Sequence, residues 1–165
     1  MTAVSGIQKI MKTIKIPGFG TLKIKNIVCD YNGTLAVDGK LLPGVSEAIN
    51  NISGINVHVI TADTFAGAKD QLKGTNCQLA IAPMENQAQW KLDYVDSLDA
   101  RATVCIGNGR NDRLMLKEAA LGIALIQKEG ASSETLVNAD IVCLSIIHAL
   151  ELFSNPKRII ATLRS

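Results

Sequence analysis

Three polar segments of this chain each follow a short apolar run, and their side chains are of types that bind ligands. Asp30 comes directly after one apolar run, Thr61 ends another, and residues 108–112 (N-G-R-N-D) follow a third. In an α/β protein, ligands bind in the crevice beyond the carboxyl ends of the strands, so an acid at that place is a candidate ligand-binding group. The alternative is that Asp30 only caps a turn, as Asp often does. If the three runs are strands of one parallel sheet, the three segments meet at one edge and form one site.

The elements that must position these segments alternate between strand-like and helix-like patterns. Short apolar runs rich in β-branched residues predict strands, and longer segments with an apolar face predict helices. Strands are expected over residues 26–30, 55–61, 78–82, 102–107, 122–126 and 141–144, and helices over 45–52, 65–73, 85–98, 113–120, 132–137, 145–153 and 156–163. Ahead of them, the alternation on both sides of Pro17-Gly18 predicts a β-hairpin, and Asp38-Gly39 predicts the turn of a small flap.

Strands separated by helices of this length predict an α/β fold of three layers, a Rossmann-like parallel sheet with helices on both faces. A chain of 165 residues fits one domain. Within it, residues 1–25 are expected to form an N-terminal extension and the hairpin, and residues 26–165 the core.

The composition excludes several classes of protein. Hydrophobic residues make up 47% of the chain and charged residues 19%, which predicts a packed core rather than disorder. The formal net charge of +2 argues against nucleic acid as the main partner. No apolar run reaches the roughly 18–20 residues that a membrane span needs. The four cysteines form no C-x-x-C pair and are expected to be reduced, so we expect a cytoplasmic protein that binds no membrane.

The amino end is basic, because residues 1–29 contain five lysines and no acid. One interpretation is a solvated terminal segment without a specific role. The other is a basic rim that steers an anionic substrate toward the site.

Residues 30–35 (D-Y-N-G-T-L) resemble the D-x-D-G-T-L motif of the haloacid dehalogenase (HAD) superfamily of phosphatases and phosphotransferases. They are more similar to the D-K-T-G-T-L-T of the phosphorylation domain of P-type ATPases. Residues 61–63 (T-A-D) resemble the T-G-D of those pumps, residues 107–112 (G-N-G-R-N-D) their G-D-G-x-N-D, and residues 139–142 their A-D-I-V. The resemblance implies a HAD-like fold and a small soluble relative without the membrane and nucleotide-binding parts of the pumps.

The resemblance also implies how the matching residues act on phosphate. Asp30 is the expected nucleophile, because a carboxylate can attack phosphorus and form an aspartyl-phosphate. Thr61, Ala62 and Asn111 are expected to contact the phosphoryl group.

A lysine is needed to neutralise the carboxylate and phosphate charges of such a pocket. Lys91 is the best candidate, because it opens a segment similar to the K-x-x-x-V-x-x-L helix that precedes the glycine-rich turn in the pumps. Lys69 and Lys73 are weaker candidates, and each of them also fits a solvated helix face.

Magnesium is the cofactor that the resemblance implies. Mg²⁺ prefers hard oxygen ligands in octahedral geometry and keeps several waters. Its expected ligands are Asp30, the backbone carbonyl of Asn32, Asn108 and Asp112, the last directly or through water.

Two residues depart from the pattern of the dedicated phosphatases. Asn32 stands where those enzymes have an Asp that serves as general acid and base, a contribution of typically 10²–10⁴-fold in rate. Asn108 stands where the family has a metal-binding Asp. These residues predict slow turnover by a phosphohydrolase or phosphotransferase. The alternative is a non-catalytic domain that binds phosphate or regulates a partner.

The segments between the motifs are too short to hold a cap domain or a site for adenosine. An uncapped site suits a phosphorylated substrate as large as a macromolecule, or it is closed by a second subunit of a homo-oligomer. ATP is therefore not the expected substrate.

Overall fold

The computed structural model describes residues 11–62 and 67–165, and a parallel sheet lies at its centre. Its strands are β3 (Asn26–Asp30), β6 (Asn56–Thr61), β7 (Gln78–Ile81), β8 (Thr103–Gly107), β9 (Leu121–Leu125) and β10 (Ile141–Cys143). They are arranged in the order β10-β9-β8-β3-β6-β7. The six predicted core strands are therefore confirmed, and β3, which carries Asp30, lies inside the sheet between β6 and β8.

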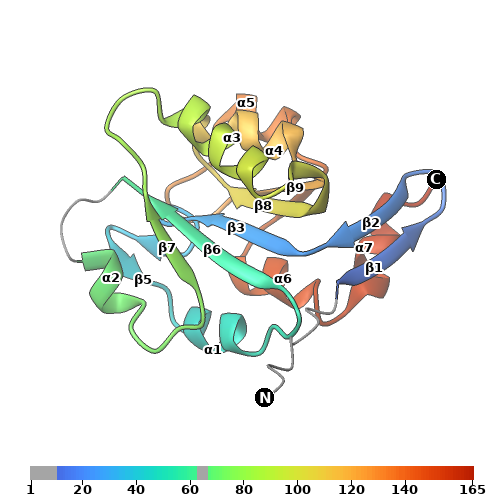
Figure 1. Cartoon of the computed structure of the whole chain (residues 1–165), viewed down its shortest axis with the longest axis horizontal. Helices are drawn as coiled ribbons and strands as arrows, with labels where there is room; N and C mark the ends of the chain where they lie inside the picture. The colour runs from blue at the N-terminus through green and yellow to red at the C-terminus, as the bar shows by residue number, and fades with distance from the viewer. Residues whose placement is uncertain (1–10, 63–66) are drawn as a thin grey trace, which may run out of the picture.

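Helices cover both faces of the sheet. They are α1 (Val45–Asn50), α2 (Gly67–Gln71), α3 (Gln87–Ser97), α4 (Arg113–Glu118), α5 (Ser133–Val137), α6 (Ile146–Glu151) and α7 (Pro156–Leu163). Figure 1 shows α3, α4 and α5 above the sheet and α1 and α6 below it. The predicted helix over residues 65–73 begins outside the described residues. Asp63, the last residue of the T-A-D motif, also lies outside them. Of the helices in the described ranges, none is both long and apolar enough to cross a membrane.

The sheet is buried on both faces, as a parallel sheet between helices must be. Successive side chains of a strand point to opposite faces. In β3, Ile27 and Cys29 pack into the core on the side of α1 and α6, whereas Val28 packs into the core on the side of α3 and α4. All five residues of β3 are buried, so the strand that carries Asp30 is fixed from both sides.

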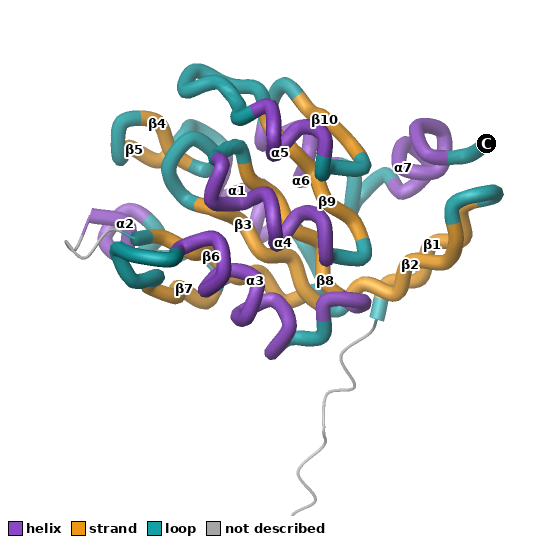
Figure 2. The backbone as a smooth tube through the Cα atoms, turned by 90° about the horizontal axis from the view of Figure 1, so that it is seen from above, coloured by secondary structure: helices purple, strands orange, loops and turns teal. Residues whose placement is uncertain are grey.

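The predicted hairpin is confirmed and lies far from Asp30. Strands β1 (Lys12–Ile16) and β2 (Gly20–Ile24) pair antiparallel and extend beside α7 (Figure 2). Because β2 leads directly into the amino end of β3, the hairpin lies at the sheet edge opposite to Asp30 (Figure 1). The hairpin lysines therefore do not form a rim of the predicted site, and Lys9 lies outside the described residues.

The predicted flap is a second, smaller hairpin of β4 (Ala36–Val37) and β5 (Lys40–Leu41). Its turn residues Asp38 and Gly39 both have positive φ, 51° and 74°, as a two-residue type I′ turn requires. In the described part of the chain, this flap and α1 are the only elements between β3 and β6. No large cap domain is inserted there.

Candidate active site

The three predicted segments meet at the carboxyl edge of the sheet. Asp30 ends β3, Thr61 ends the neighbouring β6, and the turn 108–112 follows β8 on the other side. They enclose a pocket of about 160 Å³. The pocket is lined by Asp30, Asn32, Thr61, Ala62, Gln87, Lys91, Asn108, Gly109 and Asn111. Every predicted site residue except Asp112 thus lines this pocket.

A buried ion-pair cluster lies beneath this pocket. The Nζ atom of Lys91 lies 2.6 Å from Oδ1 of Asp30 and 2.6 Å from Oδ1 of Asp112. Lys91 is 1% exposed and Asp112 is 0% exposed, whereas Asp30 is 8% exposed and faces the pocket. Lys91 reaches this place from α3, which packs against α4 above the sheet. Lys69 and Lys73 are exposed on or beside α2 and do not line the pocket.

Asp112 holds the glycine-rich turn in place. Its Oδ2 atom accepts hydrogen bonds from the backbone N–H groups of Asn108 (3.0 Å) and Gly109 (2.9 Å), while Oδ1 faces Lys91. A Cβ atom at Gly107 would lie 2.5 Å from the Asp112 carboxylate, so this close approach requires glycine. Both oxygens of Asp112 are thus engaged behind the pocket, a geometry that favours an indirect role near a metal.

Asn108 packs tightly against the loop that follows Asp30. Its Oδ1 accepts a hydrogen bond from Oγ1 of Thr34 (3.3 Å), and its Nδ2 donates to the carbonyl of Gly130 (3.0 Å). Gly33 has φ 80°, and a Cβ there would lie 2.6 Å from Oδ1 of Asn108. Two independent reasons therefore require glycine at position 33: its backbone is left-handed, and a side chain there would collide with Asn108.

Burial and the neighbouring charges shift the pKa values of Asp30 and Lys91. Burial, and next the charge of Asp112, raises the pKa of Asp30 to about 7, although Lys91 and a backbone hydrogen bond at Tyr31 act in the opposite direction. Burial alone would lower the pKa of Lys91, but the two carboxylates outweigh it and hold that pKa above its ordinary value. Lys91 is therefore charged at neutral pH. With both carboxylates ionised, the cluster carries one uncompensated negative charge.

These residues fit a Mg²⁺ ion. The pocket offers the carboxylate of Asp30, the amide of Asn108 and the backbone at the exposed Asn32, which are the hard oxygen donors that Mg²⁺ prefers. A cation would also compensate the excess negative charge. Across residues 11–62 and 67–165, no group of three or more His, Cys, Asp or Glu side chains is placed to hold a metal ion. Such a site would rely on one carboxylate and on waters.

The sequence analysis missed two glutamines. Gln87, at the start of α3, lines the pocket, and its Oε1 accepts a hydrogen bond from Nδ2 of Asn111 (2.7 Å). Gln127, after β9, donates to the backbone carbonyls of Gly33 (3.2 Å) and Thr34 (2.9 Å). Neither glutamine belongs to a motif, so only the spatial arrangement identifies them.

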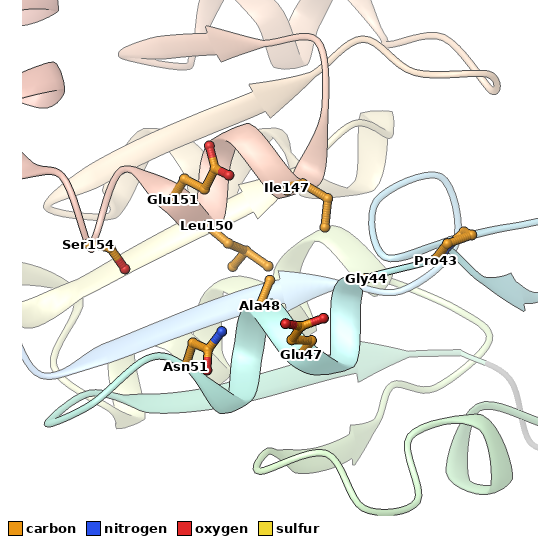
Figure 3. Close-up of a pocket in the computed structure, with 9 residues that line it drawn as sticks. All are labelled: Pro43, Gly44, Glu47, Ala48, Asn51, Ile147, Leu150, Glu151 and Ser154. Atoms are coloured by element: carbon orange, nitrogen blue, oxygen red, sulfur yellow. The ribbon is translucent and has the colours of Figure 1, made fainter.

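A larger cavity of about 440 Å³ lies away from this site, between α1 and α6 (Figure 3). Figure 3 shows Glu47, Ala48 and Asn51 of the α1 segment opposite Leu150 and Glu151 of α6. None of the predicted site residues lines it. Its size alone therefore gives it no link to the candidate site.

Comparison by sequence identifies one partial relative and no family. No protein-family model matches the chain. An uncharacterized protein of Methanocaldococcus jannaschii is 51% identical over 61 residues, which are 37% of this chain and 66% of that protein. The match therefore spans just under two thirds of that relative's length.

Many solved structures resemble the fold, and three of them illustrate the likeness. The 3-deoxy-D-manno-octulosonate 8-phosphate phosphatase of Moraxella catarrhalis, solved with magnesium, phosphate and KDO, has a TM-score of 0.65 at 18% identity, covering 86% of this chain and 94% of that one. The cobalt-bound deoxy-D-mannose-octulosonate 8-phosphate phosphatase of Haemophilus influenzae has a TM-score of 0.67 at 12% identity, with the same coverage of 86% and 94%. A Legionella pneumophila protein assigned to subfamily III A of the HAD superfamily has a TM-score of 0.65 at 16% identity, covering 85% and 87%.

The chain therefore has the fold of the HAD superfamily, without a large cap in its described part. The solved structures that share this fold include a protein assigned to subfamily III A and two octulosonate 8-phosphate phosphatases.

Proposed function

We propose that this protein is a Mg²⁺-dependent phosphohydrolase or phosphotransferase that forms an aspartyl-phosphate on Asp30. The observation that carries the proposal is the placement of Asp30 in the lining of a small polar pocket, paired with Lys91 at 2.6 Å. A carboxylate in this position can reach a phosphorus atom in the pocket. The structural likeness to phosphatases supports the same reaction class.

In the first step, a carboxylate oxygen of Asp30 attacks phosphorus, the acyl P–O bond forms and the P–O bond to the leaving group breaks. Lys91 lies next to the attacking carboxylate and offsets its negative charge, which would otherwise repel the anionic phosphoryl group. Thr61, Ala62 and Asn111 line the pocket that surrounds the phosphoryl oxygens. Bound Mg²⁺ would neutralise charge on the phosphoryl group, held by Asp30, the Asn32 carbonyl and Asn108, with Asp112 acting through water.

In the second step, water attacks the aspartyl-phosphate, and the P–O bond to Asp30 breaks to release phosphate and the carboxylate. Asn32 lies at the pocket, but its amide can neither give a proton to the leaving group nor accept one from the attacking water. Water must therefore supply and accept these protons. We expect a long-lived aspartyl-phosphate and slow turnover.

The surroundings of the pocket indicate what the substrate can be. An open groove of about 570 Å³ shares Gln87 and Asn111 with the pocket and is otherwise lined by residues such as Met84, Arg110 and Arg113. The leaving group of a phosphorylated substrate would extend over the Gln87–Asn111 hydrogen bond into this groove. Because the described residues form no large cap over the pocket, the substrate can be a macromolecule, or a second copy of the chain can close the site.

The motif order supports a finer relationship. Residues 30–35, 61–63, 107–112 and 139–142 follow the order and type of the motifs in the phosphorylation domain of P-type ATPases. We propose that the chain shares its closest ancestry with that domain. The Asn at position 32 fits this ancestry, because the pumps also lack an acid there.

A second candidate function is a non-catalytic domain that binds phosphate or regulates a partner. The amides at Asn32 and Asn108 favour it, because each replaces an acid that the dedicated phosphatases use. The intact Asp30–Lys91–Asp112 cluster favours the enzyme.

The experiment that tests the proposal is a thermal unfolding series with Mg²⁺ and beryllium fluoride, which mimics a phosphoryl group on Asp. We expect the two together to raise the melting temperature of the wild-type protein and to leave Asp30→Asn unchanged. If the wild-type protein shows no Mg²⁺-dependent shift, the proposal is wrong.

A further inference from the structure

One side chain ties the loop after Asp30 to a helix that is distant in the sequence. Nε2 of Gln127 donates to the carbonyls of Gly33 (3.2 Å) and Thr34 (2.9 Å). Its Oε1 accepts a hydrogen bond from the backbone N–H of Ile146 (2.9 Å), the first residue of α6. Gln127 is half-buried and does not line the pocket, so it has no direct contact with a phosphate there.

We propose that Gln127 is a positioning residue for the phosphoryl-transfer site. It holds the backbone of residues 32–34 in the orientation that binds Mg²⁺ and the phosphoryl group. This inference rests on the proposed function, and it assigns a role to a residue outside the motifs.

The loop leaves these two carbonyls for an outside partner. Its own hydrogen bonds use the Tyr31 carbonyl, which accepts from the N–H groups of Leu35 and Ala36 (both 2.9 Å), and the Gly33 N–H, which donates to the Ala36 carbonyl (2.7 Å). They fix the two ends of the turn. Gln127 then fixes the peptide planes after Gly33 and Thr34. Gly33 has the least restricted backbone of the loop because it is a glycine.

The position of this backbone matters for two contacts of the site. The carbonyl of Asn32 is the expected Mg²⁺ ligand, and Mg²⁺ tolerates little deviation from octahedral geometry. Asn108 packs directly against Gly33, so a shift of the loop also moves or releases the Asn108 amide. A displacement of about 1 Å in a reacting group can cost on the order of 100-fold in rate.

Glutamine suits this position because it donates and accepts through the same planar group. Gln127→Glu keeps the size of the side chain and the acceptor for the Ile146 N–H, but an ionised carboxylate cannot donate to either loop carbonyl. It also places a negative charge against two carbonyl oxygens. This variant therefore separates the contact with the loop from the contact with α6.

The chain offers a matched control in Gln71. Its Oε1 accepts from the N–H of Leu41 (2.5 Å), and its Nε2 donates to the carbonyl of Gly39 (2.7 Å). It ties the flap to α2 in the same way, but neither Gln71 nor its two partners line the pocket. Gln71→Glu removes a comparable donor, and the Gly39 carbonyl keeps the hydrogen bond that Oη of Tyr31 donates (3.2 Å).

The experiment compares wild type, Gln127→Glu and Gln71→Glu in two measurements: Mg²⁺ binding by titration calorimetry, and the rise in melting temperature with Mg²⁺ and beryllium fluoride. We expect Gln127→Glu to bind Mg²⁺ at least tenfold more weakly and to lose most of the beryllium fluoride shift. Gln71→Glu should keep both. Gln127→Asn, which is one methylene shorter and cannot reach both ends, should show the same loss if Gln127→Glu does not fold.

The outcomes distinguish the role of Gln127 from the proposed function. If wild type binds Mg²⁺ and both position-127 variants bind it equally well, the role of Gln127 is refuted and the proposed function stands. If Gln71→Glu loses Mg²⁺ as strongly as Gln127→Glu, the effect is one of general stability and the positioning role is also refuted. If wild type itself shows no Mg²⁺-dependent shift, the proposed function fails and the inference fails with it.

Discussion

Two ion clusters of opposite sign both use side chains of residues 110–113, and they differ in burial. In the first, Lys91 lies between two carboxylates, those of Asp30 and Asp112, at 2.6 Å from each. In the second, Glu134 lies between two guanidinium groups, 2.8 Å from Nε of Arg110 and 3.3 Å from Nε of Arg113. The side chain of Lys91 is 1% exposed, whereas that of Glu134 is 49% exposed.

The two clusters differ in how their excess charge is compensated. The exposed cluster has one excess positive charge, which water and salt screen at little cost. When Asp30 is ionised, the buried cluster has one excess negative charge, and a charge shielded from water is costly unless a partner compensates it. A cation would compensate this charge, which is the physical basis for proposing Mg²⁺ there.

The largest expected effect comes from removing the central charge of the buried cluster. Lys91→Met leaves two carboxylates facing each other without a counter-charge, and breaking a buried ion pair costs about 3–5 kcal/mol. We expect the free energy of unfolding, measured with urea, to fall by about that amount. Lys73→Met, on an exposed lysine, is the control and should change it by less than about 0.5 kcal/mol. Equal effects of the two changes would contradict the comparison.

The second prediction adds an acid to the pocket of the buried cluster. Asn32→Asp supplies the proton donor and acceptor that the pocket lacks, and such a group typically contributes about 10²–10⁴-fold in rate. We expect hydrolysis of a generic phosphoester with Mg²⁺ to rise by about 100-fold. The metal-free variant should also be less stable than wild type, because the added carboxylate increases the uncompensated charge. An unchanged rate in a folded variant would mean that Asn32 does not limit turnover.

The third prediction concerns pH. Burial and the charge of Asp112 raise the pKa of Asp30 from 3.8 to about 7, and Mg²⁺ binds the ionised form. Mg²⁺ affinity, measured by calorimetry, should therefore fall about tenfold per pH unit below 7 and level off above it. Because the folded state holds this proton more tightly than the unfolded chain, the metal-free protein should lose stability as the pH rises from about 4 to 7. A Mg²⁺ affinity that is flat across this range would exclude Asp30 as the titrating ligand.

The smallest expected effect comes from the exposed cluster. Glu134→Gln removes the central charge there, and exposed ion pairs contribute about 0–1 kcal/mol. The free energy of unfolding should change by less than about 1 kcal/mol, and the change should vanish in high salt. A loss as large as that of Lys91→Met would refute the claim that burial distinguishes the two clusters.

The sequence was sufficient to predict most of the fold. The strands over residues 26–30 and 103–107 are buried on both faces. Strands buried in this way are almost continuously apolar, so they are easy to recognise in the sequence. The turn residues Asp38 and Gly39 have positive φ. An Asp-Gly pair between two short strands predicts such a turn directly. Helix ends were less accurate, because packing decides where a helix of one or two turns stops.

The site was predicted in part. Asp30, Thr61 and Lys91 were predicted as site residues because they belong to motifs, and the structure places all three in the lining of one pocket. The position of Asp112 behind Lys91 depends on which way its side chain turns, and no sequence pattern specifies that. Gln127 was missed because its three partners lie 19, 93 and 94 positions away in the chain.

The most direct test of the account is to look for the covalent intermediate. The wild-type protein would be incubated with acetyl phosphate and Mg²⁺, digested in acid and analysed by mass spectrometry, with Asp30→Asn as the control. The account predicts that the peptide containing Asp30 gains the mass of one phosphoryl group, and that neither the Asp30→Asn protein nor a sample without Mg²⁺ does. A phosphoryl group on any other residue, or none on a protein that binds Mg²⁺, would contradict the assignment of Asp30 as the nucleophile.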